Sequence, residues 1–339
     1  MLFEMSCKKL KPDIDRSITL EKYTEIWLQT IALDKLAKST LVREKQDIER
    51  FKPYLGSYKL VDLRPEHFRS LYTKLRKQKN KATGKPLSEA TVEGVHSCLC
   101  GILSDAMEGG YLDHNPAWRT YKYAGQKKEK KIADDETVKK LIKALEAGSI
   151  LYEAYFKLII ATGMRRGECC GLKWCDIDWE QRSIHICRNA VKVTDEEIFV
   201  KEPKTRAGNR YVYFSAEMES LLREYRQECA YITESYDQRQ LTADDFLFRR
   251  QGARLPMTPT TFTYRFKLIL KKNGLPQELN VHSLRHTAAS LMIAGGTDVA
   301  TVAGILGHSQ PSITLDIYTH AFDKNKKAAS AKLQEGLDI

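Results

Sequence analysis

The sequence predicts a mainly α-helical protein with a small antiparallel β-sheet in the second of two domains. Three observations lead to this fold class. Apolar residues recur at helical spacing between residues 19 and 110, whereas period-two segments cluster between residues 183 and 214. From Tyr121 to Lys131 the helical pattern lapses into a short basic stretch. With 339 residues, the chain is long enough for about two domains of roughly 150 residues each.

Helices are expected to make up the first domain, over residues 19–120. One is predicted from Thr19 to Leu33, and a second begins after Ser39, whose hydroxyl suits an N-cap. A third starts at Pro65, because proline is well tolerated at the first helical position. The fourth begins after Ser88 and stops at a pair of glycines. The apolar positions that repeat along these helices are Leu20, Tyr23, Trp27, Ile31, Leu41, Ile48, Phe51, Tyr54, Phe68, Leu71, Leu75, Val92, Val95, Leu99, Ile102 and Leu103.

The charge balance of the chain is strongly basic. There are 55 lysines and arginines against 44 aspartates and glutamates, which gives a net charge of +11 and a pI near 9.1. An anionic partner is therefore expected, either nucleic acid or an acidic membrane surface. No run approaches the roughly 18 apolar residues that a membrane span requires, and the amino end lacks the apolar core of a signal peptide. These features predict a soluble, cytoplasmic protein without a membrane partner.

Basic residues on helix faces and in the interdomain linker are the candidates for nucleic-acid contact. The linker, residues 121–131, could reach roughly 36 Å when extended, which is enough to follow the flank of a duplex. The competing interpretations are an ordinary solvated surface and a solvated tether. The candidate contact residues are Arg43, Lys45, Lys127, Lys128, Lys130 and Lys131.

The chain contains eight cysteines, and none of them forms a CxxC pair. A zinc framework of paired cysteines is therefore not predicted. In a chain without a secretion signal, the thiols are expected to stay reduced and to serve as small core residues. A redox switch at the adjacent Cys169 and Cys170 is the alternative.

A mixed domain of helices and strands is expected over residues 132–321. Its predicted helices cover residues 135–147, 151–161, 216–232 and 259–272, and its predicted strands cover residues 183–188, 197–202 and 210–214 and the segment DDFLF. The three period-two strands are expected to form one antiparallel sheet. In the last of them Val212 and Phe214 share one face, and Tyr211 and Tyr213 share the other. The turn PKTRAGN is predicted to be a basic hairpin tip that carries Lys204.

The segment ATGMRRGE places two arginines between apolar residues. Gly163 and Gly167 flank Arg165 and Arg166, so at least one arginine is expected to point inward. A buried guanidinium needs an anion or a carboxylate partner. Glu168 is the nearest carboxylate, and a structural ion pair is the alternative to an anion site.

The stretch from Val281 to Tyr318 gathers three histidines, an arginine and a tyrosine between short helical segments. A metal-free site that breaks a phosphodiester needs a nucleophile, fixed positive charge and groups that move protons, and this stretch contains candidates for all three. The alternative is a metal site at His282, His286 and His308. That alternative is disfavoured because the motif lacks the glutamate of HExxH and because an arginine would repel a dication.

Four motifs together give the chain its resemblance to a known family. They are ATGMRRGE, PKT in the predicted hairpin, HSLRHT, and LGHS followed by TLDIYTH. In this order and spacing, the chain resembles the tyrosine recombinases of the phage-integrase type from about Thr19 to its end. The resemblance implies a helical core-binding domain of the SAM-like type and an α+β catalytic domain. It also implies an integrase of a phage or of an integrative mobile element.

The resemblance further implies a role for six residues. The nucleophile falls on Tyr318, and the arginine two positions after the glycine is Arg165, which is preferred over its neighbour Arg166. The other matching positions are Lys204, His282, Arg285 and His308. The arginines would bind the nonbridging phosphate oxygens, the lysine would protonate the leaving oxygen, His282 would accept the tyrosine proton and His308 would donate to the phosphate. Strand cleavage would then need neither a metal, nor ATP, nor another cofactor.

The partners implied by the resemblance are double-stranded recombination sites, bound by four copies of the chain on two duplexes. The tail, residues 322–339, is predicted to be a helix that packs on a neighbouring copy or on its own domain. Accessory proteins for excision or DNA bending and an association with the nucleoid are also expected. The lead, residues 1–18, has no room for an arm-binding domain, so the protein works without one or the chain is shortened. A relaxing topoisomerase of the tyrosine type and a non-catalytic DNA-binding regulator are the alternative functions.

Overall fold

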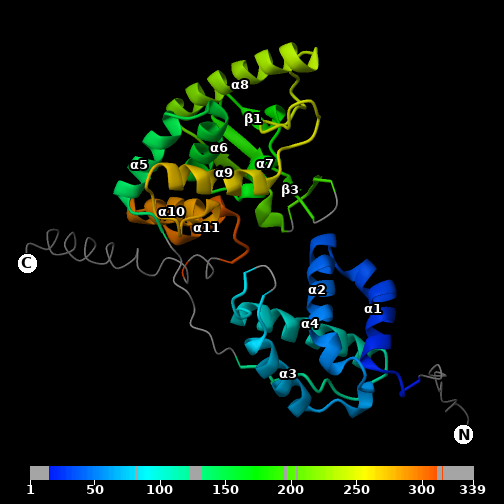
Figure 1. Ribbon diagram of the computed structural model, residues 1–339. Coiled ribbons are helices and arrows are strands. Elements are labelled where there is room, and N and C mark those ends of the chain that lie inside the picture. The colour runs from blue at the N-terminus through cyan, green and yellow to red at the C-terminus, as the bar shows by residue number, and fades with distance from the viewer. Residues whose placement is uncertain are drawn as a thin grey trace, which may run out of the picture. The chain divides into compact units, whose positions relative to one another are not determined.

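The chain divides into two units, Met1–Lys128 and Glu129–Ile339, in the computed structural model (Figure 1). Each unit has its own hydrophobic core. The structure describes residues 15–80, 83–122, 132–193, 197–203, 205–310 and 315. Helices dominate both units and the strands are short and antiparallel, which confirms the predicted fold class. None of the helices within these ranges combines the length and the apolar character needed to cross a membrane.

The described residues of the first unit form a bundle of four helices. They are α1 (Leu20–Lys35), α2 (Lys38–Leu55), α3 (Pro65–Lys77) and α4 (Glu89–Glu108), with a short 3-10 turn, η1 (Leu60–Asp62), before α3. Helix α2 contacts the other three helices. The Thr19 and Ser88 side chains cap α1 and α4 by accepting from backbone amides of the first turn. The predicted cap at Ser39 is wrong, because α2 begins at Lys38, two residues earlier than predicted, and Ala37 takes the N-cap position without a side-chain bond.

Two hydrogen bonds to Asp105 join α1 and α4, the first and last helices of this bundle. The Trp27 indole of α1 donates to Asp105 Oδ2 of α4 at 2.7 Å, and Lys35 Nζ donates to Asp105 Oδ1 at 2.6 Å. Trp27 and Asp105 are both buried, so these bonds satisfy polar atoms that water cannot reach. They fix the register of α1 on α4.

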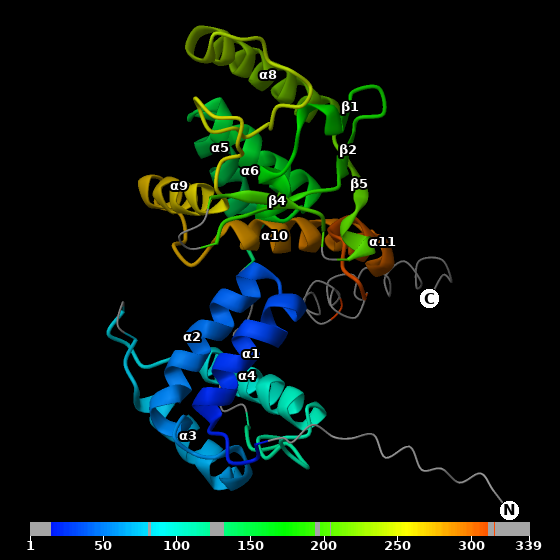
Figure 2. The ribbon, with the colours of Figure 1, turned by 90° about the vertical axis from the view of Figure 1, so that its right-hand side faces the viewer.

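The second unit is built around α6, which contacts α5, α7, α8 and α10 (Figure 2). Its helices are α5 (Asp135–Glu146), α6 (Ile150–Thr162), α7 (Arg166–Cys170), α8 (Ala216–Asp237), α9 (Pro259–Lys272), α10 (Val281–Ala294) and α11 (Val299–Leu306). The Tyr155 ring of α6 stacks on Phe262 of α9 with ring centroids 3.5 Å apart. Its hydroxyl donates to the carbonyl of Arg166 at 2.9 Å, so the aromatic core also anchors the start of α7.

The predicted single sheet is wrong, because the strands form two sheets. A three-stranded sheet has the order β1 (Ile177–Asp178), β2 (Ser183–Ile186) and β5 (Arg210–Tyr213), and a separate pair joins β3 (Asn189–Val191) to β4 (Phe199–Lys201). The segment PKTRAGN therefore connects strands of different sheets and is not a hairpin tip; it contains the 3-10 turn η3 (Arg206–Gly208).

Two glycines of the α7 region allow β3 to lie close to α7. A Cβ on Gly167 would lie 2.4 Å from Asn189 Oδ1, and one on Gly171 would lie 3.3 Å from the Ala190 amide nitrogen. The missing side chains let the β3 backbone pack directly on α7. Period-two spacing identifies strands but carries no information about this contact.

The predicted strand at DDFLF is also wrong. Between α8 and α9 the chain forms turns and isolated bridges, and the Asp245 carboxylate organises them. Arg239 donates two bonds to Asp245 at 2.7 and 2.6 Å, and the Thr242 amide donates a third at 2.8 Å. An aspartate that accepts from local backbone and side-chain donors favours a turn over a strand.

The expected use of cysteines as small core residues is confirmed for Cys98, Cys169 and Cys170, which are buried. Burial raises the pKa of the Cys170 thiol to about 12. The expectation is wrong for Cys175, which is exposed.

The Asp245 turn predicts a pH-dependent contribution to stability. Burial opposes ionisation of this carboxyl, but the bonds from Arg239 and Thr242 lower its pKa to about 2. Because the folded pKa is depressed, the stabilisation is full above the unfolded pKa of about 4 and is lost as the pH falls toward 2. We expect Asp245→Asn to lower the free energy of unfolding of the second unit by about 2 kcal/mol at pH 7 and by about 1 kcal/mol at pH 3.

Hydrogen exchange over peptides of the second unit measures this difference, because the four tryptophans are divided between the two units. The control is Asp244→Asn. This neighbouring carboxylate is exposed and lies 3.5 Å from Lys173 Nζ, so its replacement should change little. If Asp245→Asn lowers the free energy of unfolding by the same amount at pH 7 and at pH 3, the pH-dependent contribution assigned to Asp245 is wrong.

Candidate active site

Arg165 is positioned by the turn between α6 and α7. Gly163 ends α6 with φ +65°, and a Cβ at this position would lie 2.6 Å from Leu306 Cδ2. After this turn Arg165 takes the N-cap position of α7 and donates its amide to Glu168 Oε2 at 2.8 Å. Its guanidinium donates from Nη1 to Glu168 Oε1 at 2.6 Å. The Arg–Glu pair that the sequence offered as an alternative is therefore present, although 41% of the arginine side chain stays exposed.

Glu168 is the carboxylate at the centre of a buried network. It is only 2% exposed, and its Oε2 also accepts from Arg210 Nη2 at 3.0 Å. Burial alone would raise the pKa of this carboxyl, but the charge and hydrogen bond of Arg210, and then those of Arg165, hold it below its ordinary value. Glu168 is therefore an anion that binds two arginines at once.

Helix α10 contributes His282 and Arg285. Asn280 and Ser283 cap its start reciprocally, each side chain accepting from the backbone amide of the other. One turn into the helix, Arg285 is 2% exposed and donates from Nη1 to the Gly163 carbonyl at 2.8 Å. His282 lies in the first turn and is exposed, and its ring contacts the edge of the His286 ring at 4.5 Å between centroids.

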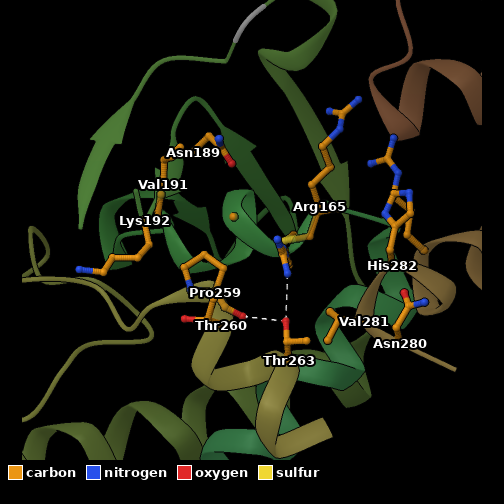
Figure 3. A pocket seen from close by; sticks show the side chains of 15 residues that line it. Arg165, Asn189, Val191, Lys192, Pro259, Thr260, Thr263, Asn280, Val281 and His282 are labelled. Atoms are coloured by element: carbon orange, nitrogen blue, oxygen red, sulfur yellow. Dashed lines mark hydrogen bonds between the residues drawn. The ribbon is translucent and has the colours of Figure 1, made fainter. Parts of the chain in front are cut away.

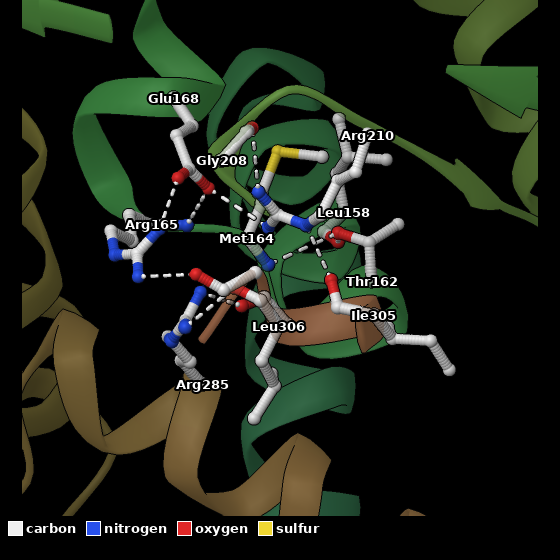
Figure 4. A network of polar contacts seen from close by, with 12 residues as sticks. Leu158, Thr162, Met164, Arg165, Glu168, Gly208, Arg210, Arg285, Ile305 and Leu306 are labelled. Atoms are coloured by element: carbon white, nitrogen blue, oxygen red, sulfur yellow. Dashed lines mark hydrogen bonds and ion pairs between the residues drawn. The ribbon is translucent and has the colours of Figure 1, made fainter. Parts of the chain in front are cut away.

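Three arginines bind the last carbonyls of helix α11 (Figure 4). Arg210 Nε donates to Ile305, Arg285 Nη2 to Leu306 and Arg165 Nη2 to Gly307, at 2.5, 2.7 and 3.1 Å. A helix leaves its final carbonyls without intrahelical partners and carries partial negative charge there, so cations suit this end. The chain continues from here into His308, which is half-buried.

A cavity of about 570 Å³ opens beside this network, between α7, β3, α9 and α10 (Figure 3). Arg165, His282 and Arg285 line it together, and Lys192 lies on the other side of the cavity from His282. Arg166 also faces the cavity and donates to the Thr263 hydroxyl at 3.0 Å. The remaining lining residues are Met164, Gly167, Asn189, Ala190, Val191, Pro259, Thr260, Thr263, Asn280 and Val281.

The structure thus gathers four of the six predicted catalytic residues in one region. Three line the cavity, and His308 directly follows the carbonyl bound by Arg165. Lys204 and Tyr318 lie outside the described residues, as do the linker candidates Lys127, Lys128, Lys130 and Lys131. The candidates Arg43 and Lys45 are exposed on α2, and Arg43 lies 3.3 Å from Glu44 Oε1.

The metal alternative finds no support in this arrangement. Within the described ranges no three His, Cys, Asp or Glu side chains gather as a ligand set, and His282, His286 and His308 all lie within those ranges.

Sequence reasoning missed Arg210, although the pattern contained a signal for it. Val212 and Phe214 were expected on one face of their strand, and Arg210 stands two residues before Val212 on the same face. In the structure all three are buried. An arginine in phase with buried apolar residues predicts a buried cation, which needs partners of its own.

Comparison with known proteins matches two family descriptions to this chain. "Phage integrase family" covers residues 131–325, and "Phage integrase, N-terminal SAM-like domain" covers residues 19–76. A XerC-like tyrosine recombinase of Caldanaerobacter subterraneus is 27% identical, with 94% of this chain and 84% of that protein covered. The ICEBs1 integrase of Bacillus subtilis is 25% identical, with 74% of this chain and 66% of that protein covered.

Solved structures share the fold of the chain. The Tn1549 transposon integrase in complex with transposon right end DNA has a TM-score of 0.76 at 19% identity, with 95% of this chain and 100% of that chain covered. The lambda integrase tetramer bound to a Holliday junction has a TM-score of 0.64 at 16% identity, with 89% of this chain and 78% of that chain covered. The resemblance inferred from the four sequence motifs is confirmed.

The geometry at the end of α11 predicts that replacing Gly307 with a larger residue destabilises the protein. Its φ is +67°, and a Cβ would lie 2.6 Å from the Ala207 carbonyl oxygen and 2.8 Å from Arg210 Nη1. We expect Gly307→Ala to lower the free energy of unfolding by about 1 to 3 kcal/mol, because a left-handed conformation strains an L-residue and the backbone oxygen cannot move away easily. Thermal or urea unfolding of the purified variant measures the loss.

Gly304 on the same helix is the matched control. A Cβ there would meet nothing within 4 Å, so Gly304→Ala should be neutral or should stabilise the helix by up to about 1 kcal/mol. Equal effects of the two substitutions would contradict the requirement for glycine at Gly307.

Proposed function

The chain belongs to the phage integrase family, and we propose that it cuts and rejoins DNA at specific sites through a 3′-phosphotyrosyl intermediate, integrating or excising a mobile element. The observation that carries this proposal is the shared placement of Arg165 and Arg285. Both bind consecutive carbonyls at the end of α11, and both line the cavity that His282 also lines. Fixed cations around one cavity are what a phosphodiester transition state requires.

In this mechanism the two arginines bind the nonbridging oxygens of the scissile phosphate. Negative charge grows on these oxygens when a fifth oxygen approaches phosphorus, and a guanidinium stays charged at any working pH. Arg165 has five N–H donors, of which two side-chain donors bind Glu168 and Gly307. With 41% of its side chain exposed, it retains donors for a substrate oxygen.

Tyr318 supplies the nucleophile, and three further residues assist it. The phenolic oxygen attacks phosphorus as the bond to the 5′ oxygen breaks, so a phosphotyrosyl ester and a free 5′ hydroxyl replace the original phosphodiester. An ordinary phenol has a pKa of about 10, so we assign His282 as the acceptor of its proton. Lys204 delivers a proton to the leaving oxygen, and His308 donates to a phosphate oxygen. Attack by a different 5′ hydroxyl reverses the step and joins strands in a new order.

The partner in this proposal is double-stranded DNA, bound by four copies of the chain on two duplexes. The similar structures include an integrase in complex with transposon end DNA and an integrase tetramer bound to a Holliday junction. The first unit would bind DNA as the core-binding domain over residues 19–120, the linker over residues 121–131 would follow the phosphate backbone, and the tail over residues 322–339 would pack on a neighbouring copy. The net charge of +11 suits this role and a place on the bacterial nucleoid. Excision or DNA-bending proteins would act as accessory factors.

The nucleophile assignment predicts the behaviour of Tyr318→Phe. We expect the native protein to form a covalent adduct with duplex DNA that survives SDS and that forms in EDTA. The phenylalanine variant should form none, because it lacks the attacking oxygen, and it should bind DNA as the native protein does. Gel analysis of labelled DNA from the element's ends measures the adduct, and sequencing the trapped DNA identifies the crossover site.

Two results would overturn this assignment. An adduct that persists in Tyr318→Phe would exclude Tyr318 as the nucleophile. An activity that EDTA abolishes would favour the metal-dependent alternative. Tyr213→Phe is the control, because this exposed tyrosine lies on β5 and should leave adduct formation unchanged.

The linker assignment predicts a change in the salt dependence of DNA binding. If Lys127, Lys128, Lys130 and Lys131 bind phosphates, replacing all four with glutamine should flatten the plot of log affinity against log salt by about 0.9 for each phosphate that is no longer neutralised. Titration of a fluorescent duplex at several salt concentrations measures this slope.

A second variant with the same change in charge provides the control. It replaces four exposed lysines on α5 and α9, which are Lys139, Lys143, Lys271 and Lys272. The linker acts only as a solvated tether if both variants change the slope equally.

A further inference from the structure

We infer that Arg210 is a positioning residue of the active site, which holds Arg165 in place through Glu168 and fixes the end of α11. This inference rests on the proposed function, because it assigns a task to Arg210 within the same reaction. Arg210 itself lies outside the set of residues that line the cavity, so it acts through its neighbours.

The contacts of Arg210 join three separate segments of the chain. Its Nη2 donates to Glu168 Oε2 at 3.0 Å, its Nε donates to the Ile305 carbonyl at 2.5 Å, and its Nη1 donates to the Gly208 carbonyl at 3.2 Å. Glu168 binds Arg165, and Ile305 lies three residues before His308. One guanidinium therefore connects α7, the turn η3 and the end of α11 (Figure 4).

Arg210 is held in a well-defined position by its surroundings. It is 9% exposed, and its backbone belongs to β5, where it pairs with Ile186 of β2 in the three-stranded sheet. Side chains on regular elements are held more accurately than side chains on loops. The planar fork of an arginine can also bind three acceptors in fixed directions, which a lysine ammonium on a flexible stem does not do.

Because two arginines share Glu168, Arg210 affects how Arg165 is positioned for catalysis. Arg210 satisfies part of the charge of this buried carboxylate, so Arg165 is not its only cation. Without Arg210, the buried charge of Glu168 would fall on Arg165 alone, and their ion pair would tighten. Arg165 would then be drawn toward Glu168 and away from a phosphate oxygen.

The experiment compares Arg210→Gln with the native protein on two duplexes that carry the crossover site identified by adduct sequencing. One duplex has an ordinary scissile phosphate, and the other has a methylphosphonate, which lacks one negatively charged oxygen. The readout is the rate of covalent adduct formation at saturating DNA. We expect Arg210→Gln to slow adduct formation about 100-fold on the phosphate, since small misplacements of a catalytic group have effects of this size.

On the methylphosphonate the same variant should be slowed less than about 10-fold, because a neutral linkage depends less on a correctly placed cation. An equal loss on both duplexes would overturn the inference, since the residue would then act on something other than the phosphate clamp. Absence of an adduct with the native protein on the ordinary duplex would instead overturn the proposed function itself.

A matched control separates positioning from folding. Arg249 forms a buried ion pair with Asp237 in the same unit, so Arg249→Gln carries a comparable loss of a buried pair and should leave the rate ratio of the two duplexes unchanged. Arg210→Lys is the second variant, which keeps a charge near Glu168 and should show a smaller version of the same pattern. If both Arg210 variants unfold at a temperature where Arg249→Gln is folded, Arg210 is a stability residue and the inference is wrong.

Discussion

The end of helix α11 is the point on which the catalytic arrangement depends. Three consecutive carbonyls, from Ile305 to Gly307, accept from three different arginines, and Glu168 binds two of these arginines. A single arginine could bind several different acceptors, and a single carbonyl several different donors. Together, these bonds leave little freedom in the positions of the three arginines and of the end of α11. The carbonyls are satisfied only if the arginines arrive from α7, β5 and α10, and the arginines are satisfied only if α11 ends here.

The apolar core makes this convergence possible. Gly163 and Gly307 are far apart in the sequence, yet the Leu306 side chain packs where a Cβ on Gly163 would lie. Helix α6 connects the two regions because it packs on α10, and its Tyr155 ring stacks on Phe262 of α9 while its Tyr155 hydroxyl donates to the Arg166 carbonyl at the start of α7. Burial of apolar surface provides the free energy, whereas the polar network determines the geometry.

Much of this fold could be predicted from the sequence, because apolar spacing and a proline or serine at the start indicate helices α3, α4 and α9. The motif arginines and His282 were also predictable from residue type and order. The pairing of β2 with β5 was not, since alternation shows that a segment is a strand but not which strand it joins. The same limit applies to Arg210. The alternation of the strand predicts that its side chain lies on the buried face, but its three acceptors come from segments that only the folded chain brings together.

The net charge of the network explains how it can bind a phosphate in addition to forming its internal bonds. Arg165, Arg210 and Arg285 contribute three positive charges, and Glu168 contributes one negative charge because its arginine partners keep its pKa low. The helix end adds about half a negative charge. Positive charge therefore remains in excess after every internal bond is formed, and the half-exposed Arg165 presents it to the cavity. A site that balanced its arginines fully would be more stable without DNA but would have nothing left to attract a phosphate. We regard the incomplete neutralisation around Glu168 as the property that links the stability of this domain to the chemistry proposed for it.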